Sequence, residues 1–162
     1  KRQYMTNTRD ILASRLAQLD RHFSSFRDYK ALIDDLLLRK NIYDTDIFLS
    51  LEPAQRAILD AYLKRFSSIQ DMLGAKIFPL LLAISGIGAQ RMSDVLENVE
   101  KEGIIDSLDS WIELLEIRND LEHEYPDSLS DALKDLMFCV DSYGKIKLYC
   151  ENSSAFAARY GL

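Results

Sequence analysis

The sequence predicts an all-α fold, an antiparallel up-and-down bundle of about five helices, and three observations predict it. Apolar residues recur at steps of three, four and seven along most of the chain, which places them on one side of a helix. No alternating apolar and polar pattern is longer than four residues, so strands are not expected. Six Gly and three Pro in 162 residues suit long helices with short connections.

The length and the net charge of the chain limit its possible domain organisation and its possible binding partners. A chain of 162 residues fits one domain, and no low-complexity tract or Gly/Ser linker divides it, so we expect a single helical domain over residues 1–162. The formal net charge of −6 argues against a surface that holds nucleic acid non-specifically, because such binding needs clustered Lys and Arg. A small local basic site and a basic protein partner both remain compatible with this charge.

The first helix is expected over residues 8–40. One apolar stripe defines it, made of Leu12, Leu16, Leu19, Phe23, Phe26, Ile33 and Leu37. Asn7 or Thr8 can supply the N-cap, and the polar Lys30 at a stripe position allows a local bend. Residues 41–50 are expected to form a connection.

A second helical pattern begins near Ser50 and Pro53, because proline is favoured in the first turn of a helix. Gly74 and Pro79 interrupt the pattern, so one kinked helix or two successive helices are expected. Residues 85–90 end it.

A short third helix is expected over residues 93–102, with Gly103 as its stop. A fourth helix opens at Ser107 or Asp109. Pro126 closes it, because the residue before a proline avoids helical backbone angles.

The last helix begins near Ser128 or Ser130, and its end, residues 153–162, is expected to fray. Cys139 and Cys150 lie on this one helix, about 16 Å apart along the axis, which is too far for a disulfide. Two reduced thiols are typical of a cytoplasmic protein.

No membrane attachment is expected. The first residues lack the hydrophobic run of a signal peptide. The longest apolar stretch, residues 77–89, is too short to span a bilayer. We therefore expect a soluble, cytoplasmic protein.

The two histidines differ in their surroundings. Neither has the neighbours of a metal site, so no metal and no cofactor is expected. His22 is interpreted as a surface residue. His123, in contrast, is close in sequence to Arg118, Asn119 and Tyr125, and near a helix end these side chains can converge on one small surface.

These residue types suit work on a phosphodiester. The imidazole of His123 can take or give a proton near neutral pH. The guanidinium of Arg118 can hold phosphate oxygens and stabilise charge in the transition state. Asn119 can orient the imidazole or a sugar hydroxyl, and Tyr125 can donate to a phosphate or stack on a base. No metal is needed if the nucleophile is the ribose 2′-hydroxyl.

A purely structural alternative stays open for both residues. Arg118 could pair with Asp120, Glu122 or Glu116 on its own helix. His123 could be a residue favoured at a helix C-terminus by the helix dipole.

The motif and the helix order resemble those of the HEPN superfamily. The run resembles its Arg-x4-His signature, and in particular the Arg-x4-His-x-Tyr form of HepT-like toxins; it reads Arg118-Asn119-Asp120-Leu121-Glu122-His123-Glu124-Tyr125. The helix order resembles the family over the whole chain, because the motif lies late and one helix follows it. At the level of the motif, the resemblance covers about eight residues.

The resemblance implies a metal-independent endoribonuclease of a toxin–antitoxin pair that acts as a homodimer on RNA. His123 would be the general acid or base, and Arg118 would stabilise the transition state. It also implies a minimal nucleotidyltransferase as antitoxin, which can transfer AMP to the motif tyrosine, here Tyr125. A non-catalytic HEPN module that binds a nucleotide or a partner protein is the alternative. The acidic neighbours of the motif bear on this choice, because they repel RNA unless they point away or pair with cations.

Overall fold

The computed structural model describes residues 2–123 and 128–162, and for Met5 and His123 it describes the backbone alone. All regular structure in this part of the chain is helical, so the predicted all-α class is confirmed. In chain order the elements are α1 (Arg2–Leu37), α2 (Thr45–Leu49), α3 (Pro53–Asp71), the π-helix η1 (Met72–Ile77), α4 (Phe78–Ile84), α5 (Met92–Lys101), α6 (Leu108–His123), α7 (Leu129–Asp141) and α8 (Tyr143–Ala158).

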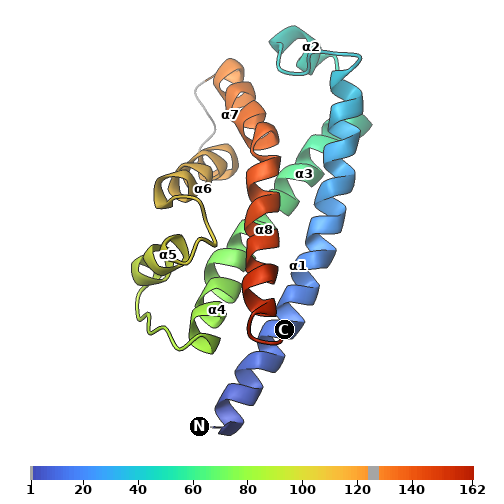
Figure 1. Cartoon of the computed structure of the whole chain (residues 1–162). Helices are drawn as coiled ribbons and strands as arrows, with labels where there is room; N and C mark the ends of the chain where they lie inside the picture. Colours follow the sequence, from blue (N-terminus) through green and yellow to red (C-terminus); the bar gives the residue numbers. More distant parts are fainter. Residues whose placement is uncertain (1, 124–127) are drawn as a thin grey trace.

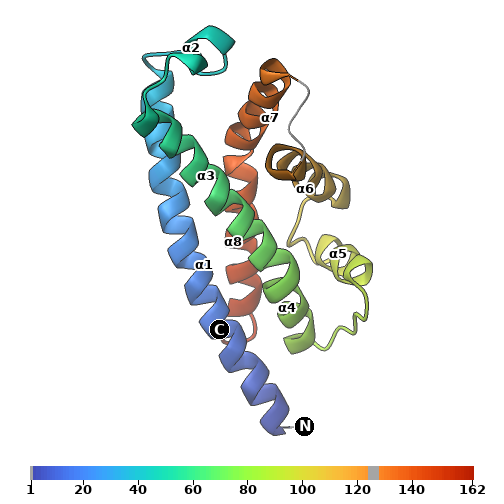
Figure 2. The ribbon, with the colours of Figure 1, turned by 180° about the vertical axis from the view of Figure 1, so that it is seen from behind.

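Successive elements join into longer rods. α3, η1 and α4 form one continuous rod that returns antiparallel to α1, and α7 and α8 form a second rod that lies beside both (Figure 1). The shorter α5 and α6 lie on the side of the bundle away from α1, as the reverse view also shows (Figure 2). With α1, these rods give the expected up-and-down course, and α2 is an additional short helix at one end.

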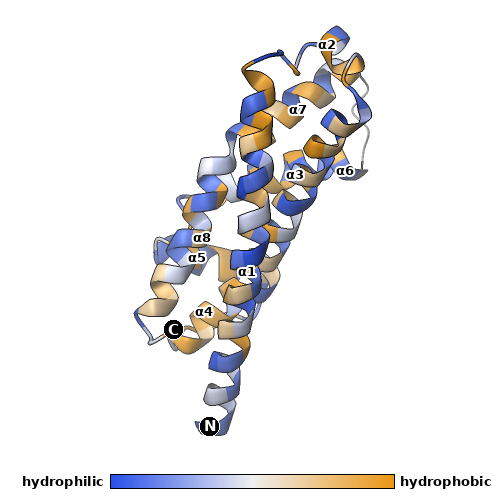
Figure 3. Ribbon diagram, turned by 90° about the vertical axis from the view of Figure 1, so that its right-hand side faces the viewer, coloured by the Kyte–Doolittle hydropathy of each residue, from blue (hydrophilic) through white to orange (hydrophobic). Residues whose placement is uncertain are grey.

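The core forms where α1, α3 and α8 face one another. Four residues of α1 spaced by seven, Leu12, Leu19, Phe26 and Ile33, are almost fully buried. Phe26 stacks on Tyr62 of α3 with ring centroids 4.6 Å apart. Burying each such side chain stabilises the fold by roughly 1.5–3 kcal/mol. Blue and orange alternate along α1 in Figure 3, as expected for a helix with one buried side.

The start of α1 differs from the prediction. The helix begins at Arg2, so the predicted N-cap at Asn7 or Thr8 is wrong. The Thr8 hydroxyl instead donates to the carbonyl of Tyr4, at 3.0 Å inside the helix. α1 is also uninterrupted at Lys30, whose ammonium pairs with Asp34 at 2.6 Å.

Residues 41–50 are not a plain connection. Asp44 caps the short helix α2, because its carboxylate accepts hydrogen bonds from the backbone N–H groups of Asp46 and Ile47, at 3.0 and 3.1 Å. The helix expected to begin near Ser50 and Pro53 begins at Pro53, and Glu52 is its N-cap.

The interruption predicted from Gly74 and Pro79 is a π-helix. Pro79 has no N–H group to donate one turn back, and the wider turns of η1 end just before it. Gly74 lies inside η1 against Trp111 of α6, where an added Cβ would be 3.1 Å from the indole ring. Arg15 of α1 donates to the carbonyl of Lys76 at 2.8 Å.

The continuous helix Pro53–Ile84 is long and apolar enough to cross a membrane by length and composition. The expectation that no stretch reaches this length is therefore wrong. The finding is weak evidence for a membrane, because 56% of the most apolar window is buried inside the bundle, as in the core helix of a soluble protein.

α5 and α6 agree with the prediction. Gly103 has a φ of +73° and ends α5 in the left-handed conformation. The Ser107 hydroxyl accepts from the backbone N–H of Ser110 at 3.0 Å, so Ser107 rather than Asp109 opens α6.

The last predicted helix is two helices. It breaks at Ser142, whose hydroxyl donates to the carbonyl of Phe138 at 2.7 Å, so Cys139 and Cys150 lie on different helices. Both thiols are buried and free. The predicted fraying is also wrong, because α8 continues to Ala158 and buries Phe156.

Candidate functional site

α6 carries the motif and lies between the α3–η1 rod and α7. Trp111 and Leu114 anchor it, since both are buried in the core. The indole of Trp111 fits against Gly74, where any larger residue would crowd it. Arg118 comes one turn after Leu114 on the same buried side of the helix.

The guanidinium of Arg118 is engaged on all sides. Nη1 donates to the Asp71 carboxylate at 2.7 Å and to the Ser67 carbonyl at 3.3 Å. Nε and Nη2 donate to the Asn119 side-chain oxygen at 3.3 and 2.9 Å. Glu122 lies near the outer edge, with its carboxylate 4.0 Å from Nε. Arg118 therefore fastens α6 to α3.

The expected open guanidinium is not found in the single chain. The Arg118 side chain is only 8% exposed, whereas its partner Asp71 is 68% exposed. The arginine thus lies in the seam between α3 and α6, with one side covered by protein and its ion-pair partner at the surface. The three same-helix carboxylates considered as partners are secondary, since the strongest contact comes from α3.

The other motif residues are placed to different degrees. Asn119 is half-buried and is coupled to Arg118 through its side-chain oxygen. The backbone of His123 ends α6, four residues after Asn119. The His123 side chain, Tyr125 and the helix-closing Pro126 lie outside what the structure describes. The site that is visible is therefore the Arg118–Asn119 pair.

The surroundings of this pair are acidic. Burial raises the pKa of the Asp135 carboxyl on α7, and the charges of Asp120 and Asp131 raise it further. Burial also raises the pKa of the Cys139 thiol to about 12, with Asp135 and Glu122 adding to the rise. The guanidinium of Arg118 opposes that rise, so it partly offsets the negative charge at the α6–α7 contact.

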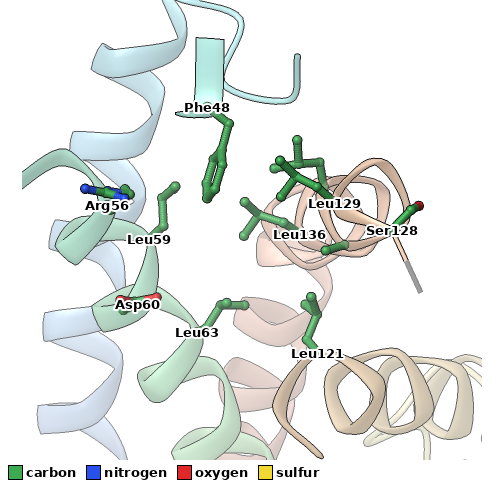
Figure 4. Close-up of a pocket in the computed structure, with 11 residues that line it drawn as sticks. Phe48, Arg56, Leu59, Asp60, Leu63, Leu121, Ser128, Leu129 and Leu136 are labelled. Carbon is green, nitrogen blue, oxygen red and sulfur yellow. The ribbon is translucent and has the colours of Figure 1, made fainter. Parts of the chain in front are cut away.

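An apolar pocket of about 490 Å³ borders the motif helix. It lies between α2, α3, the end of α6 and the start of α7, and Figure 4 shows Phe48, Leu121 and Leu136 pointing toward the same space. Leu121 belongs to the motif run, so the pocket and the Arg118–Asn119 pair share one helix. Its apolar lining suits a hydrophobic or aromatic group rather than a phosphate.

Sequence reasoning missed the α3 partners of the site. Ser67 and Asp71 of α3 and Gly74 of η1 are spaced by four and three, so they share the side of the α3–η1 rod that turns to α6. This spacing is the signal that could have pointed to them. His22 was expected to be a solvated or hydrogen-bonding surface histidine, and the structure shows it half-buried and hydrogen-bonded to Arg65, a partner that the sequence did not indicate. Within residues 2–123 and 128–162, no group of three His, Cys, Asp or Glu side chains is placed to hold a metal ion.

Comparison with models of protein families, with curated proteins and with solved structures gives no match for this chain.

Proposed function

We propose that this chain is a metal-independent endoribonuclease of the HEPN, HepT-like kind that acts as a cytoplasmic homodimer. The observation that carries the proposal is the Arg-x4-His-x-Tyr run at the end of α6. The Arg118–Asn119 contact adds support, because the amide holds the guanidinium in a fixed position near the helix end.

The reaction follows from the chemistry of the two residues. One His123 imidazole takes the proton of a ribose 2′-hydroxyl, and the 2′-oxygen attacks the adjacent phosphorus. The bond from phosphorus to the 5′-oxygen breaks, and a second imidazole gives that oxygen its proton. Arg118 stabilises the charge that grows on the phosphate oxygens. The products are a 2′,3′-cyclic phosphate and a 5′-hydroxyl.

A dimer would supply the second imidazole. A twofold axis near the end of α6 brings two copies of His123 to one cleft, so one can act as base and the other as acid. Arg118 would have to exchange its contact with Asp71 for one with the phosphate.

A second function is favoured by the burial of Arg118. A guanidinium whose donors are taken by Asp71, Ser67 and Asn119 suits a non-catalytic HEPN module. Such a module would use the α6 surface to bind a nucleotide or a minimal nucleotidyltransferase. In the toxin–antitoxin case the same enzyme would be the antitoxin, and AMP transfer to Tyr125 would place phosphate charge beside Arg118 and obstruct RNA.

The test compares cleavage of single-stranded RNA by the purified protein in EDTA with cleavage by His123→Ala and Arg118→Ala variants. We expect cyclic phosphate ends from the unchanged protein, loss of cleavage in both variants, and a mass in solution twice the 18.6 kDa of one chain. Arg39→Ala is the matched control, because this arginine pairs with Asp35 on the exposed side of α1.

Cleavage that persists in the His123→Ala variant would reject the catalytic role. A protein that leaves RNA intact but forms a complex with a nucleotide or a nucleotidyltransferase would instead support the second function.

A further inference from the structure

A polar pocket, separate from the apolar one, lies on the other side of α3. It has a volume of about 480 Å³ and is lined by Arg21, His22 and Ser25 of α1 and by Arg65, Met72 and Lys76 of the α3–η1 rod. Ser67, which contacts Arg118, lies about 160° around α3 from Arg65 by the 100° helical step. The pocket is therefore separate from the motif on α6.

The lining of this pocket is basic in an acidic protein. Arg21, Arg65 and Lys76 all contribute to it, and it contains no Asp or Glu among the described residues. None of these three cations is found in an ion pair within the described parts of the chain. Three positively charged side chains thus lie around one pocket without an ion-pair partner among the described residues, in a chain whose net charge is −6.

His22 adds a further hydrogen-bond donor to this basic lining. Its Nδ1 is 2.8 Å from Nη1 of Arg65, and since arginine can only donate, Nδ1 accepts. A neutral imidazole then carries its proton on Nε2. Burial lowers the pKa of His22, and the charges of Arg65 and Arg21 lower it further, which favours this neutral form.

The walls of the pocket are held in place by the fold. Met72 is buried and begins the π-helix that also carries Lys76. Arg15 of α1 donates to the Lys76 carbonyl at 2.8 Å and so fixes η1 against α1. π-helical turns are often found at functional sites, where they redirect a side chain.

We propose that this pocket between α1 and the α3–η1 rod binds a phosphate group, carried by a mononucleotide or by the backbone of RNA. Arginine and lysine donors neutralise the oxyanion, and the volume accommodates more than the phosphate itself. The proposal does not depend on the ribonuclease function, because none of its residues contacts Arg118.

The test follows the imidazole signals of His22 by NMR in the full chain while inorganic phosphate, AMP or a short RNA is added at constant ionic strength. A variant with both Arg21→Gln and Lys76→Gln removes two cations of the lining. Arg27→Gln is the control for the loss of one surface charge, since this exposed arginine of α1 lies outside the pocket.

We expect saturable shifts of the His22 signals and a rise in the pKa of His22, because an adjacent anion favours the protonated imidazole. The double variant should bind about tenfold or more weakly, the loss expected for removed charge-assisted hydrogen bonds. Tighter binding of AMP than of phosphate would identify a nucleotide, and a further gain with RNA would identify the backbone.

Two results would overturn the proposal. One is a His22 response that does not saturate or that sodium chloride reproduces at equal ionic strength. The other is an equal loss of binding in the Arg27→Gln variant, which would reflect net charge alone. The double variant can be checked for folding by its circular dichroism, and both changes are in exposed residues of helices.

Discussion

At the scale of single residues, the side chain of Arg118 would have to fill two roles. It fastens α6 to α3 through Asp71 and Ser67, and the proposed reaction needs the same guanidinium for a phosphate. An exposed carboxylate such as Asp71 could be exchanged for a phosphate, because the phosphate oxygens would replace it as acceptors for the buried guanidinium.

A pair of variants separates the structural role of Arg118 from its proposed catalytic role. Arg118→Ala removes a buried side chain together with its hydrogen bonds, so the free energy of unfolding in urea should fall by about 1–3 kcal/mol. Asp71→Asn should lower it by less than Arg118→Ala does, because the amide oxygen can still accept from the guanidinium, and it should leave RNA cleavage unchanged or faster, because a charged competitor of the phosphate is gone. Slower cleavage in a fully folded Asp71→Asn variant would mean that Asp71 positions Arg118 for the reaction.

The sequence could identify the motif but not what surrounds Arg118. Spacing along one helix indicates partners such as Glu122, which is four residues away. The closest partner, Asp71, is 47 residues away, and only the packing of α6 on α3 brings it near. The same holds for His22, whose contact with Arg65 depends on the packing of α1 on α3.

At the scale of elements, periodicity predicted α1, α5 and α6 because each has one continuous apolar side. It failed where a local polar contact decides the backbone. Asp44 caps α2 within a segment too short to show a period, and the stripe of the last helix continues across Ser142 although the helix does not. Hydrophobic spacing carries no information on either event.

Two glycines, Gly74 in η1 and Gly144 in α8, allow a prediction about stability. Gly74→Ala places a methyl group 3.1 Å from the Trp111 ring, which then has to shift within a packed core. The free energy of unfolding should therefore fall by about 1–3 kcal/mol. Gly144→Ala, in α8 with open space around it, should instead stabilise by about 0.5–1 kcal/mol through helix propensity. Thermal unfolding of both variants measures the difference, and equal melting temperatures would mean that the α6–η1 contact is loose.

At the scale of the whole molecule, Asp106 joins the α5–α6 connection to the last helix. The Tyr149 hydroxyl donates to it at 2.5 Å, and Lys145 pairs with it at 3.2 Å. Burial alone would raise the pKa of Asp106, but the hydrogen bonds from Tyr149, Ser107 and Lys145 outweigh it and hold that pKa below its ordinary value.

The sign of the pH effect follows from this lowered pKa. Asp106 contributes stability above its unfolded pKa of about 3.9, and the contribution is lost as the pH falls through its lower value in the folded chain. Asp106→Asn should therefore reduce the fall in stability below about pH 4, by no more than about 1 kcal/mol because solvent screens the site. Urea unfolding between pH 7 and pH 3 measures it, with the exposed Asp28→Asn of α1 as control. An undiminished fall in Asp106→Asn would place acid sensitivity elsewhere.

The predicted class and the up-and-down order hold for the molecule as a whole, because a chain with few glycines and prolines and one apolar side per helix has few other ways to bury that surface. The expectation that no apolar stretch is long enough to span a bilayer failed for a different reason. A helix at the centre of a bundle is apolar on more than one side, and composition alone does not distinguish it from a span.

The ion pair between Arg118 and Asp71 links ligand binding to the docking of a helix. An anion that binds the guanidinium breaks its ion pair with Asp71, which holds α6 on α3. The free energy of binding is therefore reduced by the cost of weakening the α3–α6 contact. By reciprocity, whatever presses α6 onto α3 weakens the hold on that anion. Amide hydrogens of α6 should then exchange faster in the occupied protein than in the free one, the reverse of the protection that ligands usually confer.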